Sequence, residues 1–117
     1  MQYLLLLYSR ESGWADLPAA AQHQAMAGYN AYTEALKTAG AYKAGSRLQP
    51  TSSATTVRVA DGKSQVLNGP YADSKEQLGG YYLIEATDLD AAIAWAARCP
   101  GASHGTVEVR PLWSPPA

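Results

Sequence analysis

The strongest restriction on the fold of this 117-residue chain is an Asp-Gly pair at residues 61 and 62. It stands between two segments rich in β-branched residues, 55–59 and 64–68, and Asp-Gly is typical of a two-residue type I′ hairpin turn. Such a turn pairs residue 58 with 65 and residue 57 with 66, so the valines of the hairpin share one face. Arg58 lies on the opposite, more polar face.

The rest of the chain predicts an α+β fold around this hairpin. An apolar run at 2–8 is typical of a central strand, and apolar residues at helical spacing predict a helix that Asp16 begins as N-cap and Gly40 ends. A loop through Gly45 and Pro50 precedes the hairpin, and a loop at 68–80 follows it. The remaining predicted elements are a strand at 81–86, a helix from an N-cap at Thr87 to the residue before Pro100, a strand at 106–110 and a proline-rich tail at 111–117.

The order β-α-(hairpin)-β-α-β predicts a largely antiparallel sheet with helices on one face. Residues 1–117 are long enough for one domain and too short for two. A sheet covered on one side must hide its other face, so we expect a homodimer in which two such faces meet, with a cavity between or beside the sheets.

Composition excludes several classes of protein. The chain is 47% hydrophobic and 16% charged with a net charge of -1, which gives no electrostatic reason to expect nucleic acid or an anionic membrane as a partner. Its single cysteine, Cys99, rules out an intramolecular disulfide and a zinc site with several cysteines, and we expect no cofactor. The apolar opening is short and has no basic residue before it, so we expect a cytoplasmic protein and read the opening as a strand.

The segment after the hairpin resembles a known family. Asn-Gly-Pro-Tyr-Ala-Asp-Ser-Lys-Glu at 68–76 is similar to the Asp-Gly-Pro-Phe-Ala-Glu-(Thr)-Lys-Glu motif of the DGPF branch of the YCII-related (YciI-like) proteins. The resemblance covers nearly the whole chain, and it extends to 3–8, 48–50, 54–58, 95–100 and 107–111. It implies a ferredoxin-like fold that assembles as a dimeric α+β barrel, and it implies no established activity. Some relatives accompany sigma-factor regulators, and others are similar to small lyases or isomerases that process rings.

Two departures from the family pattern affect the expected chemistry. Asn68 stands where the motif has Asp, and an amide cannot act as the general base that a carboxylate could be. Tyr71 stands where the motif has Phe. The Arg-Pro-x-His signature of the enzyme-like relatives is absent from the start of the first helix, and we expect His23, which lies nearby, to face solvent.

The candidate site residues fall into three groups. His104 is the candidate proton carrier, because its reference pKa near ~6.5 suits proton transfer at neutral pH, although an inert surface histidine is the more common outcome. Arg58 could anchor a substrate carboxylate or form a salt bridge with loop carboxylates. The further substrate-binding candidates are Tyr8, Tyr71, Tyr81, Asp73, Lys75 and Glu76, and the structural motif comprises Asn68, Gly69, Pro70, Gly79 and Gly80.

Two functions remain open at this point. The first is a lyase or isomerase that acts on a small anionic molecule. The second is a non-catalytic module that senses a metabolite or contacts a partner linked to transcription. An anion cradle formed by the loop glycines and Lys75 is a weaker alternative to a purely structural loop, because no phosphate-binding glycine pattern is present.

Overall fold

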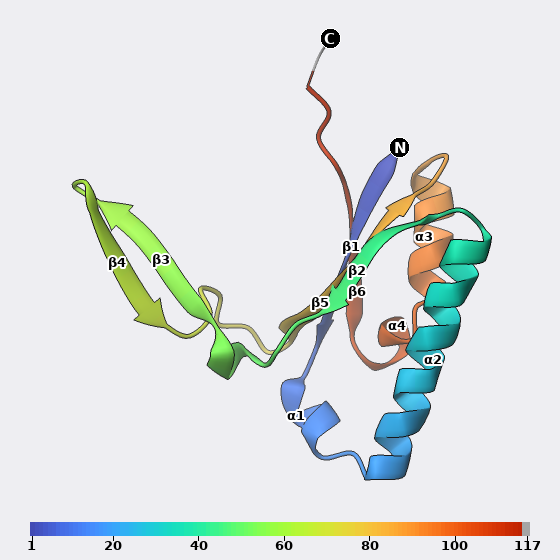
Figure 1. Ribbon diagram of the computed structural model, residues 1–117, viewed down its shortest axis with the longest axis horizontal. Helices are drawn as coiled ribbons and strands as arrows, with labels where there is room; N and C mark the ends of the chain where they lie inside the picture. Colours follow the sequence, from blue (N-terminus) through green and yellow to red (C-terminus); the bar gives the residue numbers. More distant parts are fainter. Residues whose placement is uncertain (116–117) are drawn as a thin grey trace.

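Two β-α-β units share one antiparallel sheet in the computed structural model, which describes residues 1–115 (Figure 1). The sheet has the strand order β2-β5-β1-β6. Helices α2, α3 and α4 lie on one side of it, so the predicted α+β class with helices on one face is confirmed. The elements are β1 (Gln2–Ser9), α1 (Glu11–Ala15), α2 (Ala19–Thr38), β2 (Tyr42–Arg47), β3 (Thr55–Ala60), β4 (Lys63–Asn68), β5 (Gln77–Glu85), α3 (Leu89–Arg98), α4 (Gly101–His104) and β6 (Thr106–Pro111), with a 3-10 turn at Thr51–Ser53.

Strand β1 lies at the centre of the sheet, as its apolar sequence predicts. It pairs with β5 on one side and β6 on the other. Tyr3 and Leu5 alternate with Leu4 and Leu6, and the first pair is buried beneath the helices. The second pair is half-buried on the other face of the sheet, which we call the helix-free face.

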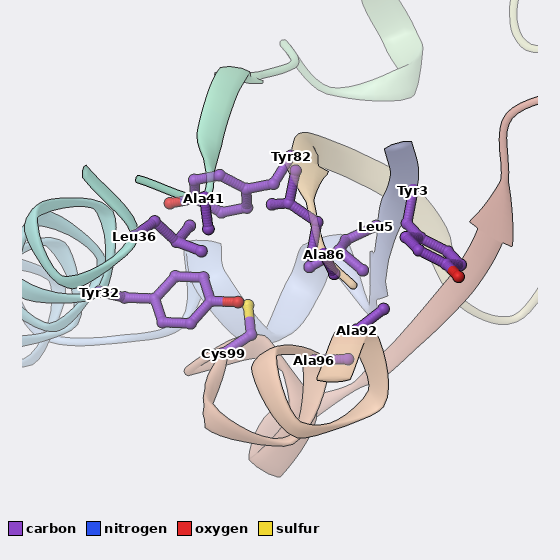
Figure 2. Close-up of a cluster of buried hydrophobic side chains, with 11 residues drawn as sticks. Tyr3, Leu5, Tyr32, Leu36, Ala41, Tyr82, Ala86, Ala92, Ala96 and Cys99 are labelled. Atoms are coloured by element: carbon purple, nitrogen blue, oxygen red, sulfur yellow. The ribbon is translucent and has the colours of Figure 1, made fainter. Parts of the chain in front are cut away.

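The core lies between the sheet and the helices. Leu5, Leu36 and Ile84 are fully buried, and Ala92 and Ala96 give α3 a flat surface that packs closely on the strands. Figure 2 shows Tyr32 of α2 pointing across this core toward Cys99. Its hydroxyl donates a 2.7 Å hydrogen bond to the carbonyl of Trp95, so the polar end of this buried tyrosine has a partner.

Strand β2 corrects the prediction of a loop between α2 and the hairpin. Its sequence, Tyr-Lys-Ala-Gly-Ser-Arg, lacks the β-branched residues that indicate a strand, and it forms because its backbone pairs with β5 at the edge of the sheet. Gly45 allows this pairing, since a Cβ there would lie 2.8 Å from Cδ1 of Tyr82. Lys43 and Arg47 are exposed on this edge strand, as is common where further strand pairing must be avoided.

The sequence predicted the C-terminal end of α2 correctly and its N-terminal end incorrectly. Gly40 adopts φ +72°, and the bonds from Gly40 N to Lys37 O and from Ala41 N to Leu36 O complete the expected glycine cap. The predicted N-cap at Asp16 is wrong. Asp16 instead ends the short helix α1, and α2 begins after Pro18, whose fixed φ suits the first turn.

The hairpin has the predicted turn and register but does not join the main sheet. Asp61 and Gly62 have φ values of 50° and 74°, as a type I′ turn requires, and residue 58 pairs with 65. Strands β3 and β4 form their own two-stranded sheet, inserted in the connection from β2 to β5. At the base of this insertion Leu48 N donates to Gly79 O at 2.8 Å.

Two of the predicted boundaries need further correction. Strand β5 begins at Gln77, so the last four residues of the predicted loop belong to it, because Gln77 and Leu78 pair with β1 and Gly80 pairs with both β1 and β2. In the proline-rich tail, Pro111 ends β6 and residues 112–115 have no regular secondary structure, whereas residues 116 and 117 lie outside the described residues.

The N-cap of α3 gives a test of this local structure. Asp88, one residue after the predicted cap Thr87, accepts a 2.8 Å hydrogen bond from Ala91 N through Oδ1. We expect Asp88→Ala to lower the free energy of unfolding by about 1 kcal/mol, because a helical N–H loses its acceptor. Thr87→Ala is the matched control and should change it by less than about 0.5 kcal/mol. Urea denaturation measures both, and equal losses would contradict this assignment.

Candidate functional site

A cavity of about 370 Å³ lies between α1, the middle of α2 at Met26, Tyr29 and Thr33, and the edge of the sheet at β2 and β5. It exists because α2 packs unevenly on the sheet. The buried residues of this helix, Tyr32 and Leu36, are in its C-terminal half, whereas Met26 in its N-terminal half is exposed and lines the cavity. Helix α1 and the segment at 48–50 close the remaining sides.

Aromatic rings form much of the cavity wall. Trp14 comes from α1, Tyr29 from α2, and Tyr42 and Tyr82 from the sheet. The guanidinium of Arg47 lies over the Trp14 ring at 4.2 Å from its centroid, a distance typical of a cation–π contact. Flat apolar walls beside one cation form a surface that suits a planar organic anion.

Glu11 lines the cavity, and both oxygens of its carboxylate already accept hydrogen bonds from Thr51. Its Oε1 accepts a 2.7 Å hydrogen bond from Thr51 N, and its Oε2 accepts one of 2.9 Å from Thr51 Oγ1. Glu11 N in turn donates to Oε1 of Gln77 at 3.1 Å. These bonds fasten α1 to the segment that leaves β2, so Glu11 stabilises one side of the cavity.

Hydroxyl groups on the opposite wall form a directed chain. Thr33 Oγ1 donates to the carbonyl of Tyr29 at 2.9 Å and lies 2.8 Å from the hydroxyl of Tyr82. Because a threonine hydroxyl has one proton, the Tyr82 hydroxyl is the donor in the second bond. The lone pairs of the Tyr82 oxygen can then accept a hydrogen bond from another group.

Burial keeps these tyrosines protonated. It raises the pKa of Tyr29 to about 12, with further contributions from the neighbouring Cys99 and Tyr82. Burial also raises the pKa of Tyr82, partly opposed by its hydrogen bond to Thr33. Both phenols are therefore neutral at physiological pH and are not phenolate bases, and the proton of Tyr82 is already donated to Thr33.

Glycines bring the strands close together on the sheet side of the cavity. A Cβ on Gly80 would lie 3.0 Å from the carbonyl oxygen of Ser46 on the neighbouring strand. Gly79 stands at an irregularity in β5, where the register with β1 shifts between Leu7 and Tyr8. Both glycines line the cavity, as does Tyr81.

Most of the other residues predicted for the site lie elsewhere. Arg58 is exposed on β3, His104 is exposed at the end of α4, and Tyr71 is 80% exposed after β4. Asp73 and Lys75 are exposed between β4 and β5, and within residues 1–115 Arg58 forms no ion pair with the loop carboxylates Asp73 and Glu76. The cavity lining contains none of these residues.

The remaining predicted residues serve local contacts. Tyr8 is half-buried on β1 opposite Thr106, and Glu76 accepts a 2.8 Å hydrogen bond from Thr106 Oγ1. Gly69 adopts φ +118°, and its N donates to Ala54 O at 2.7 Å, a conformation that favours glycine and fits a structural role. Asn68 pairs with Thr55 at the end of the hairpin, and Pro70 follows on the surface.

Sequence reasoning missed the residues that shape the cavity. Arg47 fell in the predicted loop, and Trp14 fell between two predicted elements. One signal was available, since a helix stripe that carries both Tyr29 and Tyr32 in place of leucines indicates polar groups beneath the helix. Pairing Arg47 with Trp14 required the fold, because 33 positions separate them in the sequence.

Charged and sulfur-containing groups do not gather into a metal site in the described part of the chain. Residues 1–115 contain no group of three or more His, Cys, Asp or Glu side chains that could hold a metal ion. Cys99 is buried, and burial raises the pKa of its thiol, as expected for a cysteine that acts as a small core residue. In the same residues, no helix is long and apolar enough to cross a membrane.

Sheet order, covered face and cavity together define a small ferredoxin-like α+β domain with a recess beside its first helix. The model of the YCII-related domain matches residues 1–114. The chain therefore belongs to the YCII-related domain family. The uncharacterized protein R00369 of Rhizobium meliloti (strain 1021) is 37% identical over 114 residues, which cover 96% of this chain and 92% of that protein.

A solved structure shares the fold at low sequence identity. It is 5-chloro-2-hydroxyhydroquinone dehydrochlorinase (TftG) from Burkholderia phenoliruptrix AC1100, in complex with 2,5-dihydroxybenzoquinone. The likeness has a TM-score of 0.56 and 17% identity, and it covers 97% of this chain and 94% of that one. At this identity the likeness establishes a shared fold.

Spectrophotometric titration tests the environment of Tyr29. Since its pKa is raised to about 12, Tyr29→Phe should remove absorbance change from the part of the phenolate titration above pH ~11. The unfolded state loses this proton near pH ~10, so the stability that Tyr29 contributes is complete below that pH and falls as the pH rises toward 12. In denaturant, the absorbance change that the parent shows and the variant lacks should instead appear near pH ~10. A Tyr29 that titrates near pH ~10 in the folded protein would contradict its burial at the cavity.

Proposed function

We propose that this protein binds a small, planar, negatively charged organic molecule in the cavity between α1, α2 and β2. The observation that carries the proposal is the stacking of Arg47 on Trp14 beside that cavity. The volume of the cavity, about 370 Å³, is within the range of small-molecule sites, which begins at ~300 Å³.

Each wall has a separate role in this proposal. Arg47 neutralises the charge of the ligand and can donate two parallel hydrogen bonds to a carboxylate or to neighbouring ring oxygens. Trp14 supports the flat guanidinium and offers its ring to the ligand. Tyr29 and Tyr82, both neutral at physiological pH, offer their rings to the ligand, and the oxygen of Tyr82 can accept a hydrogen bond from it.

Lyase-type chemistry on a hydroxylated ring is the second candidate function. The structural neighbour is a dehydrochlorinase in complex with a dihydroxybenzoquinone, a flat ring with acidic hydroxyls of the kind that the Arg47 wall suits. The hydrogen bonds of Glu11 argue against turnover. Both oxygens of its carboxylate already accept hydrogen bonds from Thr51, so this group is not a free base. Binding without turnover, as in a metabolite sensor, fits that arrangement better. The roles assigned to His104 and Arg58 from the sequence remain predictions.

The expected homodimer is part of the same proposal. Leu4 and Leu6 of β1 and Leu83 of β5 lie on the helix-free face, since their cross-strand partners alternate with buried residues. A second copy stacked on this face would cover these leucines and give the dimeric α+β barrel that the family resemblance implies.

Ligand binding can be tested with 2,5-dihydroxybenzoquinone and quenching of tryptophan fluorescence. We expect Arg47→Met to weaken binding by about tenfold or more, because a charge-assisted contact to the ligand is lost. Arg58→Met is the matched control, since Arg58 is exposed on the hairpin and should leave the affinity unchanged. Equal effects of the two substitutions would contradict the assignment of the site.

The two candidate functions separate in a second measurement. Chloride release from 5-chloro-2-hydroxyhydroquinone, followed with a chloride-selective electrode, would support lyase chemistry if it depends on Arg47 and Glu11. Binding of the quinone with no chloride release above the uncatalysed rate would favour the binding module.

A further inference from the structure

We propose that the hairpin formed by β3 and β4, residues 55–68, is an arm that clasps a second copy of this chain. The proposal rests on the face-to-face dimer proposed above and adds a second contact region to it. The three valines of the hairpin form its docking surface, which we call the valine face: Val57, Val59 and Val66.

Among the residues that the structure describes, the hydrophobic side chains of the arm are largely uncovered. Val57, Val59 and Val66 are 59%, 69% and 61% exposed, and Leu67 on the opposite face is 63% exposed. Figure 1 shows the arm projecting away from the sheet. The radius of gyration is accordingly 16.3 Å, against about 13 Å expected for a compact chain of this length.

Local hydrogen bonds hold the arm at its base. Gly69 N donates to Ala54 O at 2.7 Å, and Thr56 Oγ1 donates to Gly69 O at 2.8 Å. Beyond these bonds the arm depends on its own cross-strand pairs. A two-stranded hairpin alone is marginally stable in water, and exposed valines add to its cost, so the arm requires a packing surface outside its own chain.

The position of the arm identifies a second copy as that surface. In Figure 1 the helices lie on one side of the sheet, and the arm projects from the other. That other side is the helix-free face with Leu4, Leu6 and Leu83. A copy stacked on this face therefore meets the arm, and two-fold symmetry places its own arm against the first copy in the same way.

The charges of the helix-free face are compatible with this contact. Glu108 accepts a hydrogen bond from Arg110 Nε at 2.8 Å, and Glu85 pairs with the N-terminal ammonium at 2.9 Å. These carboxylates are already neutralised within one chain at the margins of the face. A like face can thus approach without bringing unpaired charges together.

The dimensions favour a dimer that uses both regions. Four strands at about 4.8 Å spacing and about 20 Å length give a face of roughly 400 Å², half of the ~800 Å² per partner of a standard interface. Two further strands add roughly 200 Å². Since packed sheets lie ~10 Å apart and the arm is ~20 Å long, the arm extends past the partner's sheet and lies along its flank.

Light scattering over a range of protein concentration tests the arm. We expect the parent protein to be a dimer and the triple variant Val57→Thr, Val59→Thr and Val66→Thr to raise its dissociation constant about tenfold or more, because threonine keeps the strand propensity and loses the apolar contact. The matched control, Arg58→Thr with Gln65→Thr, changes the other face of the arm and should raise the constant less than about threefold. Unchanged circular dichroism verifies that the variants fold.

Hydrogen exchange of the parent protein gives an independent readout. Amides within 55–68 should exchange more slowly as dimer forms, and dilution should remove this protection. A parent dimer with exchange at 55–68 independent of concentration, together with an unchanged dissociation constant in the triple variant, would overturn the arm and leave the face-to-face dimer intact. A monomeric parent would overturn both the arm and the face-to-face dimer. Ligand binding in the cavity is tested separately by tryptophan fluorescence, so its outcome can be distinguished from this one.

Discussion

Pairing of β1 with β5 and β6 at the same time is the interaction on which the other elements depend. It places Leu5 and Tyr82 side by side under the helices and gives α2 and α3 one continuous apolar surface. Helix α2 follows that surface with its C-terminal half, where Tyr32 and Leu36 are buried. The cavity forms where Met26, Tyr29 and Thr33 of this helix face the edge of the sheet.

Local signals in the sequence predicted most of the fold. The Asp61-Gly62 turn, the glycine at the end of α2 and the apolar β1 each depend on interactions between near neighbours or on burial. Strand β2 was not predicted because it forms through its pairing with β5. That strand supplies the partner backbone and the Tyr82 ring, which lies so close to Gly45 that a side chain there would clash. The helix start at 16 was misplaced because Asp16 ends the short helix α1, and the start at 87 was misplaced because the next residue, Asp88, supplies the capping oxygen.

The site could be predicted far less well than the fold. Family resemblance directed attention to the segment after the hairpin, and of that segment Gly79 and Gly80 reach the cavity. Arg47 and Trp14 meet because β2 runs back past α1, a relation that no spacing in the sequence expresses. Physically, a short motif records local backbone needs such as the φ of Gly69, whereas a binding wall is assembled from distant segments.

The hydrogen bond from Leu48 to Gly79 has a consequence for the architecture of related chains. It brings the two ends of the inserted segment together at the edge of the sheet, so the β2 to β5 connection is already closed before the arm begins. Since the cost of loop closure grows slowly with loop length, the hairpin at 55–68 can lengthen, shorten or disappear with little effect on the sheet. The length of the hairpin can therefore change while Arg47 and Trp14 keep their places beside the cavity.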